Sequence, residues 1–181
     1  MGAKMCAIDT PSEERQRGAA GVFAKLLFQS VRSKSRLPGK WREDACKPEA
    51  IDEAHSASIM ELSLAKWPPR FRLSIHSDAG GSLVGYGVFR PAGMDRRSDD
   101  KGIREYLADP VSGGGRGTPT HWAWYREVDE PMRDFSQQET LGEVKKLRQD
   151  QQSKGDDAFR RASDDLARLA AALDAWYSKA G

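Results

Sequence analysis

The sequence predicts an α+β protein, with an antiparallel sheet of three to four strands, an N-terminal helix and a C-terminal helical pair. Three patterns indicate this fold class: apolar residues three and four apart in residues 11–33, alternation of apolar and polar residues in 58–90, and an apolar seven-residue repeat in 156–178. The chain has 181 residues, of which 38% are hydrophobic. We expect residues 1–135 to form the α+β domain and residues 136–181 to form the helical pair, packed on that domain or projecting from it.

The first predicted helix covers residues 11–33. Thr10 is placed as its N-cap and Glu13 as the capping-box partner. Its apolar stripe consists of Ala19, Val22, Phe23, Leu26, Leu27 and Val31. Gly18 and Gly21 either weaken this helix, by roughly 1 kcal/mol each relative to Ala, or allow a close contact.

The strongest strand signals lie in the middle of the chain. Alternating residues predict strands at 58–66, at about 70–76 and at 82–90, which together form a three-stranded antiparallel meander. Gly85 and Gly87 stand at alternate positions of the third strand and leave one face of it bare. We therefore expect another group to pack or bind close to that face.

The remaining elements are predicted from weaker patterns. We expect a loop at 33–48, a helix at 98–108, a strand at 121–128, and helices at 137–152 and 156–178. The repeat in the last helix consists of Phe159, Ala162, Leu166, Leu169, Leu173 and Trp176. Such a seam is typical of a helix that packs on another helix.

Composition excludes several classes of protein. No apolar stretch approaches the roughly 20 residues that a membrane helix needs, so we expect no membrane contact. Asp9 stands where a signal peptide would be apolar. Cys6 and Cys46 do not form a Cys-x-x-Cys pair. We therefore expect a cytoplasmic protein without a disulfide framework.

Motifs of catalysis are poor in this sequence. His55, His76 and His121 are scattered and lie outside any zinc-binding spacing, so we expect no metal and no cofactor. His76 shares a predicted strand face with Arg70 and Arg72, and we expect it to be exposed. Neither a nucleophile elbow nor a phosphate-binding P-loop is present in the sequence. An enzyme is therefore the less favoured reading.

One set of residues keeps a metal-dependent nuclease as a third hypothesis. Asp52, Glu61 and Lys66 resemble the carboxylates and the lysine of restriction-type nucleases. Ser63 stands where the lysine of their Glu-x-Lys motif would be. The resemblance is therefore restricted to residue types.

The positive charge is concentrated near the N-terminus. The net charge is +2, but residues 1–48 hold ten Lys or Arg against five Asp or Glu. Such asymmetry can mark a surface that binds a polyanion, but the explanation we favour is a solvated helix end and loop. The candidate nucleic-acid contacts are Arg36, Lys40, Arg42, Arg70 and Arg72.

Two short segments also bear on the nucleic-acid hypothesis. Residues 113–117 read Gly-Gly-Gly-Arg-Gly, in which backbone N–H groups and Arg116 could hold an anion, or which could be a plain flexible connector. Residues 85–89, with Tyr86 at their centre, resemble the RNP1 strand of RNA-recognition motifs. That resemblance implies base stacking on the sheet. The positions of Val88 and Phe89 are exchanged relative to the motif, which points Phe89 to the other face.

Trp122, Trp124 and Tyr125 lie together on one predicted strand. On a shared face the two tryptophans could stack on bases or anchor a partner protein, but core packing is the explanation we favour for these rings. We expect a non-enzymatic binding protein that docks on another macromolecule, most of all a protein assembly. A module that binds RNA or DNA is the alternative.

Overall fold

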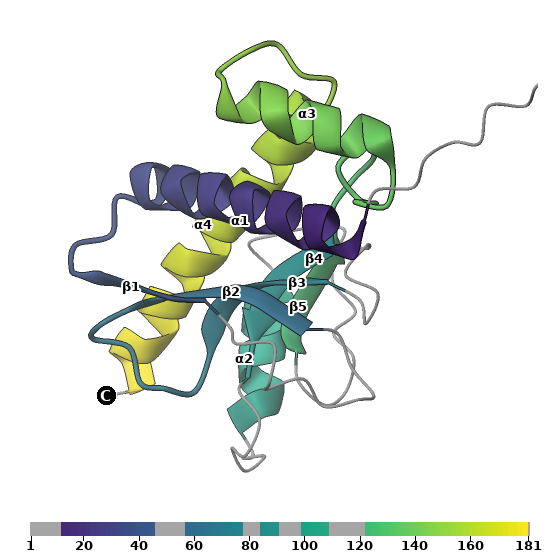
Figure 1. Cartoon of the computed structure of the whole chain (residues 1–181). Helices are drawn as coiled ribbons and strands as arrows, with labels where there is room; N and C mark the ends of the chain where they lie inside the picture. The colour runs from purple at the N-terminus through teal and green to yellow at the C-terminus, as the bar shows by residue number, and fades with distance from the viewer. Residues whose placement is uncertain (1–11, 46–56, 78–83, 91–98, 109–121, 181) are drawn as a thin grey trace, which may run out of the picture.

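The computed structural model describes five stretches of the chain, which form one antiparallel sheet and the helices that pack on it (Figure 1). The described residues are 12–45, 57–77, 84–90, 99–108 and 122–180. The α+β class predicted from the sequence is confirmed.

The sheet is a meander in which each strand pairs antiparallel with the next strand along the chain, in the order β1-β2-β3-β4-β5. The strands are β1 (Trp41–Ala45), β2 (Ala57–Leu64), β3 (Arg72–Ser77), β4 (Val84–Phe89) and β5 (Trp122–Glu127). Within the described residues the sheet therefore has five strands rather than the three to four expected.

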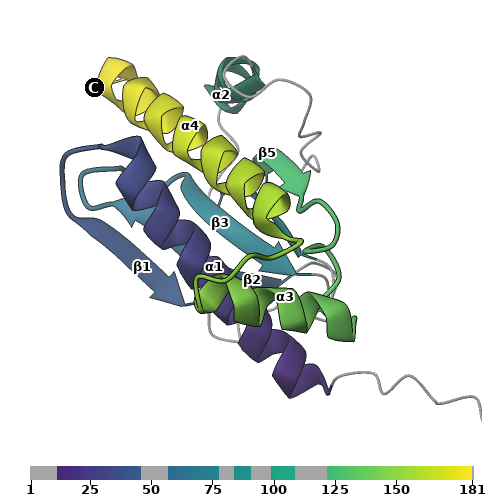
Figure 2. The same ribbon diagram turned by 90° about the horizontal axis from the view of Figure 1, so that it is seen from above.

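Helices cover one face of this sheet. They are α1 (Glu13–Ser35), α2 (Asp99–Ala108), α3 (Gln138–Arg148) and α4 (Asp156–Ala180). α1 packs on β2 and along α4, α4 packs on β3 and β4, α2 contacts β5 and α4, and α3 packs on α1 (Figure 2). None of the helices in the described part of the chain is both long and apolar enough to cross a bilayer.

The face of the sheet under α4 is apolar. Ile75 lies opposite Tyr86 and Leu73 lies opposite Val88, and all four side chains are buried. The Tyr86 hydroxyl donates a hydrogen bond to Asp165 of α4, so these residues point toward that helix. Strand alternation thus places this set of residues in the core.

The apolar seam expected in the last helix is also in the core. Ala162, Leu166, Leu169 and Leu173 are buried, and Phe159 and Trp176 are partly buried against the same core. This core contains residues of both the sheet and α4. The heptad therefore indicates a packed helix, as expected.

The sequence predicts a loop at 33–48, and the structure corrects this prediction. Residues Trp41–Ala45 form β1, which pairs with β2 at the edge of the sheet. Glu43 lies opposite Leu62 and forms an ion pair with Arg32 of α1. Charged side chains are common on edge strands, and they hide the alternation on which prediction of a strand depends.

The structure also corrects the predicted start of the first helix. The helix begins at Glu13 with Ser12 as its N-cap, whereas Thr10 lies outside the described residues. A Cβ atom added at Gly18 or Gly21 would have nothing within 4 Å. These two glycines therefore weaken the helix and do not serve a close contact.

The other predicted boundaries agree closely with the structure. The helix expected at 98–108 is α2, the strand expected at 121–128 is β5, and the last two helices are α3 and α4. The main difference is that α3 ends at Arg148 rather than at residue 152. Asp150, two residues later, has a positive φ of 54°, which is incompatible with a continuing right-handed helix.

Close packing on the second face of the sheet, the face opposite α4, explains the two glycines of β4. A Cβ atom at Gly85 would overlap the ring of Tyr125, and one at Gly87 would overlap the backbone carbonyl of Trp124. The expectation that a group packs close to this face is therefore confirmed, and that group is β5 itself.

The expectation that His76 is exposed is wrong. Only 3% of His76 is accessible. Its ring packs between Phe89 and Trp122, with centroid distances of 4.7 and 4.4 Å. β3 is thus buried on both faces, and the alternation of polar and apolar residues in its sequence does not reveal this.

Candidate functional site

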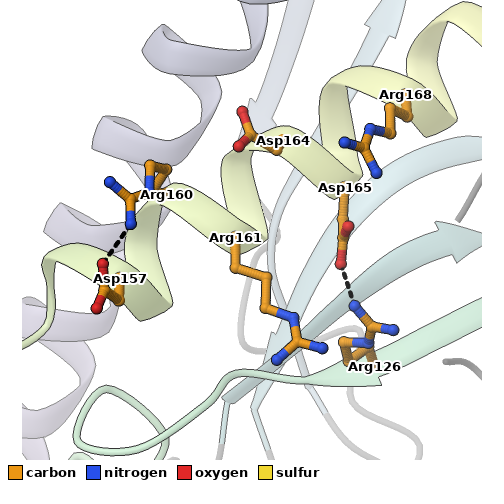
Figure 3. A pocket seen from close by; sticks show the side chains of 7 residues that line it. All are labelled: Arg126, Asp157, Arg160, Arg161, Asp164, Asp165 and Arg168. Atoms are coloured by element: carbon orange, nitrogen blue, oxygen red, sulfur yellow. Dashed lines mark hydrogen bonds and ion pairs between the residues drawn. The ribbon is translucent and has the colours of Figure 1, made fainter. Parts of the chain in front are cut away.

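A surface hollow of about 440 Å³ lies between the first half of α4 and β5 (Figure 3). Every described residue that lines it is charged: Arg126, Asp157, Arg160, Arg161, Asp164, Asp165 and Arg168. Binding sites for drug-sized molecules are mostly apolar, with a few polar groups. Because its described lining consists of Arg and Asp, the hollow favours a charged partner over such a molecule.

The spacing of residues on α4 produces this lining. Asp157, Arg161, Asp165 and Arg168 are three or four positions apart, so they form one stripe along the helix. The apolar seam of the same helix faces the core. Arg126 is added from β5, where it lies opposite Tyr86 and therefore points toward α4.

Asp165 is the most buried member of the hollow. It accepts a hydrogen bond of 2.8 Å from the Tyr86 hydroxyl and forms an ion pair with Arg126. Burial, with the neighbouring Asp165 carboxylate, raises the pKa of Tyr86 well above its ordinary value. The phenol therefore stays protonated and acts as a donor. Both groups that bind the Asp165 carboxylate, the Tyr86 hydroxyl and the Arg126 guanidinium, come from the sheet, so these contacts hold α4 on β4 and β5.

The other two carboxylates of the hollow also have cations beside them. Asp157 forms an ion pair with Arg160, and both side chains are largely exposed. Asp164 accepts from the Lys34 ammonium of α1 at 2.7 Å, and Lys34 also donates to Ser163 at 2.6 Å. Each aspartate of the lining therefore already has a cation of the chain as its partner.

The arginines are left in excess. Arg161 pairs at 2.9 Å with Asp129, which is not part of the lining. Arg168 is exposed, and within the described part of the chain it has neither a hydrogen bond nor an ion pair. Among the described residues, four guanidinium groups against three carboxylates give the lining a surplus of one positive charge.

No family model, curated protein or solved structure matches the chain significantly. The function of this protein is therefore inferred from its own side chains.

The two candidate tryptophans point to opposite faces of the sheet. Trp124 lies opposite Val88 on the helix side, and only 2% of it is accessible. Trp122 lies opposite Phe89 on the second face with 5% accessible, because the register of β4 and β5 shifts between Val88 and Phe89. They cannot form one stacking platform: Trp124 belongs to the core, whereas Trp122 packs against His76, Phe89 and Tyr125 on the second face.

Tyr86 is equally unsuited to base stacking. Only 1% of it is accessible, and its hydroxyl is bound to Asp165 beneath α4. Phe89 lies on the opposite face, in contact with His76. The strand that resembles RNP1 therefore presents its aromatic residues differently from a stacking sheet.

The arginines of β3 and of the turn before it have contacts inside the molecule. Arg72 donates to Glu61 at 2.8 Å and lies 3.5 Å from Asp44. Arg70 is partly buried, with its guanidinium 5.5 Å from the centre of the Phe71 ring. The positive charge of Arg72 is therefore offset within the sheet.

The remaining basic candidates lie after α1. Arg36, Lys40 and Arg42 are exposed, with Arg36 in the left-handed conformation at the end of α1 (φ 51°). None of the three lines the hollow. Arg116 lies outside the described residues.

The residues of the nuclease hypothesis are not assembled among those that are described. Glu61 binds Arg72, and Lys66 forms an ion pair with Asp174 at 2.7 Å, while Asp52 lies outside the described residues. In the described stretches, no three His, Cys, Asp or Glu side chains are grouped so as to hold a metal ion.

The hollow itself was missed by reasoning from the sequence. Its signal is the polar stripe of α4, which has the same spacing as the apolar seam on the other side of the helix. Because the stripe holds equal numbers of acidic and basic residues, a count of net charge does not reveal it. The contribution of Arg126 depends on tertiary structure and has no local signal.

Proposed function

We propose that this chain is a non-enzymatic binding protein that docks on another macromolecule, a protein, through the hollow between α4 and β5. The observation that carries this proposal is the mixed lining of the hollow, with four arginines and three aspartates. Arginine is among the residue types enriched in protein interfaces and in their energetic hot spots. We also propose a cytoplasmic location, in keeping with the sparse cysteines of the sequence.

The alternation of charge favours a protein over a nucleic acid as the partner. A nucleic acid presents phosphates at regular, close spacing, and binding depends on many cations that each neutralise one phosphate. Asp157 is 88% exposed at one end of the stripe and would repel such a chain. A protein surface can instead offer both signs of charge in a matching pattern.

The basic N-terminal third gives the nucleic-acid reading less support than its composition indicates. Arg32 is paired with Glu43 and Lys34 with Asp164, and outside this third the candidate Arg72 is paired with Glu61. Pairing of this kind reduces the positive potential that a polyanion would meet.

Site-specific photocrosslinking in cells tests the proposal. Ala171 is exposed one turn after Arg168, so a photoreactive residue there leaves every charge of the hollow in place. We expect ultraviolet light to join residue 171 to a protein of defined mass, with an adduct that survives nuclease treatment. The matched control carries the same group at Arg148, an exposed position on α3 outside the hollow.

Two results would count against docking of a protein at the hollow. Adducts that form equally at residues 171 and 148 would show random collision. Adducts at residue 171 that disappear on nuclease treatment would favour the nucleic-acid alternative.

A further inference from the structure

We propose that Arg168 is the anchor of a subsite that binds one anionic group, a carboxylate or a phosphoryl group, on an acidic segment of a partner protein. This inference rests on the proposed function, and it adds the chemistry that the hollow recognises.

The ion pairs of the hollow leave one cation available. Asp157, Asp164 and Asp165 are each held by a cation of the chain itself. Arg168 is exposed and has no such partner in the described stretches. An incoming anion therefore meets a guanidinium group that does not have to give up an existing ion pair.

A second arginine lies within reach along the helix. Arg161 precedes Arg168 by seven residues, which is two turns of an α-helix or about 10 Å along its axis. Asp165 stands between them (Figure 3). The Arg161–Asp129 pair is half-exposed, with side-chain accessibilities of 56% and 45%, so its exchange for another anion costs little.

Asp165 makes the subsite selective for a single anionic group. Its carboxylate remains fixed by Tyr86 and Arg126, and it lies between the two arginines as a permanent negative charge. An isolated anionic group can approach Arg168 without approaching Asp157 at the other end of the stripe. A chain of closely spaced phosphates cannot avoid both carboxylates.

The planar guanidinium suits either candidate anion. It can donate two parallel hydrogen bonds to a carboxylate or to a phosphoryl group, which an ammonium group cannot reproduce. The anionic group can therefore come from Asp or Glu, or from a phosphorylated Ser or Thr, of the partner.

Titration of the purified full chain at low salt tests this subsite. The probes are a hexapeptide of serines with one glutamate, the matching hexapeptide with one phosphoserine, and hexauridylate. We expect Arg168→Gln to weaken binding of the glutamate peptide or of the phosphopeptide by about tenfold, the loss typical of one charge-assisted hydrogen bond. Arg168→Lys should recover only part of this loss. Arg148→Gln removes the same charge outside the hollow and should change affinity less than twofold.

The tighter of the two peptides identifies the anion as a carboxylate or as a phosphoryl group. Equal losses in Arg168→Gln and Arg148→Gln, or no binding of either peptide, would overturn the subsite. Tighter binding of hexauridylate through Arg168 would overturn the commitment to an acidic protein segment.

Crosslinking from residue 171 in the Arg168→Gln chain separates the two proposals. If the Arg168→Gln chain still forms the adduct but no longer binds the peptides, docking through the hollow stands and Arg168 has no role in binding the partner. Loss of the adduct in this chain, together with loss of peptide binding, supports both.

Discussion

Gly87 and Gly18 occupy opposite environments, and substitution by alanine should have opposite effects. At Gly87 a methyl group would overlap the carbonyl oxygen of Trp124, so β4 and β5 would have to separate. We expect Gly87→Ala to lower the free energy of unfolding by about 2 kcal/mol or more, as overpacking against rigid backbone does. Gly18→Ala in α1 meets no atom within 4 Å and should raise it by about 1 kcal/mol. Urea denaturation measures both, and a stabilised Gly87→Ala chain would contradict the register of β4 and β5.

Glu143 fastens the segment between α3 and α4. One of its oxygens accepts from the Lys146 ammonium at 2.8 Å, and the other accepts from the Ser153 hydroxyl and the Lys154 N–H at 2.9 and 2.7 Å. The hydrogen bond from Lys146 is the largest influence that lowers the pKa of Glu143, with those from Ser153 and Lys154 adding to it against the effect of burial. The pKa falls from 4.5 to about 2.

This pKa gives stability a dependence on pH with a definite sign. Because the folded pKa lies below the unfolded value, the contribution of Glu143 is complete above pH 4.5 and is lost as the pH falls toward 2. Glu143→Gln should lower the unfolding midpoint at pH 7 and should reduce the fall in stability between pH 4.5 and 2. Thermal denaturation across that range is the measurement. Parallel curves for the two chains would show that Glu143 does not carry this effect.

At the scale of elements, α4 has two sides with different roles: one side packs in the core, and the other lines the hollow. Leu166 is fully buried in the apolar seam, whereas Ala171 of the same helix is exposed. Leu166→Asp would place a carboxylate in the core without a partner, so we expect a loss of about 3 kcal/mol or more. Ala171→Asp adds the same group to the surface and should change stability by about 0.5 kcal/mol or less. Chemical denaturation of both variants tests the orientation of α4, and equal losses would contradict it.

Elements with strong apolar periodicity were predictable from the sequence. The stripe of α1 and the seam of α4 each reflect one buried side, so local patterns were sufficient. The alternation of β3 and β4 was sufficient to place these strands, but it did not reveal that both of their faces are buried. β1 was not predictable, because the sequence Trp-Arg-Glu-Asp-Ala becomes a strand through pairing with β2 and through the ion pair from Arg32.

The candidate site was less predictable than the fold. Trp122 and Trp124 have the spacing of a shared strand face, but the shift in register beside them turns the two rings to opposite faces. The residues that line the hollow were overlooked because Arg126 and Asp165 are 39 positions apart in the chain and meet only in the folded protein. Long-range contacts of this kind leave no trace in local periodicity.

At the scale of the whole molecule, charge is organised by pairing rather than by segment. Lys34 of the basic N-terminal segment pairs with Asp164 of α4, and Arg32 of α1 and Arg72 of β3 pair with Glu43 of β1 and Glu61 of β2. One positive charge of the hollow is left over, at Arg168. We therefore expect charge reversal at the hollow to act locally, and not through the net charge of the protein.

The most direct test of docking at the hollow is the yield of the protein adduct at residue 171 in two matched variants. Arg161→Glu/Arg168→Glu reverses two charges on α4, and Lys145→Glu/Arg148→Glu makes the same change in net charge at exposed positions of α3 outside the hollow. Both chains are first checked for an unchanged unfolding transition. We expect the first pair to abolish the adduct and the second pair to preserve it. An adduct that survives in the first pair, or that is lost equally in both, would contradict docking through the hollow.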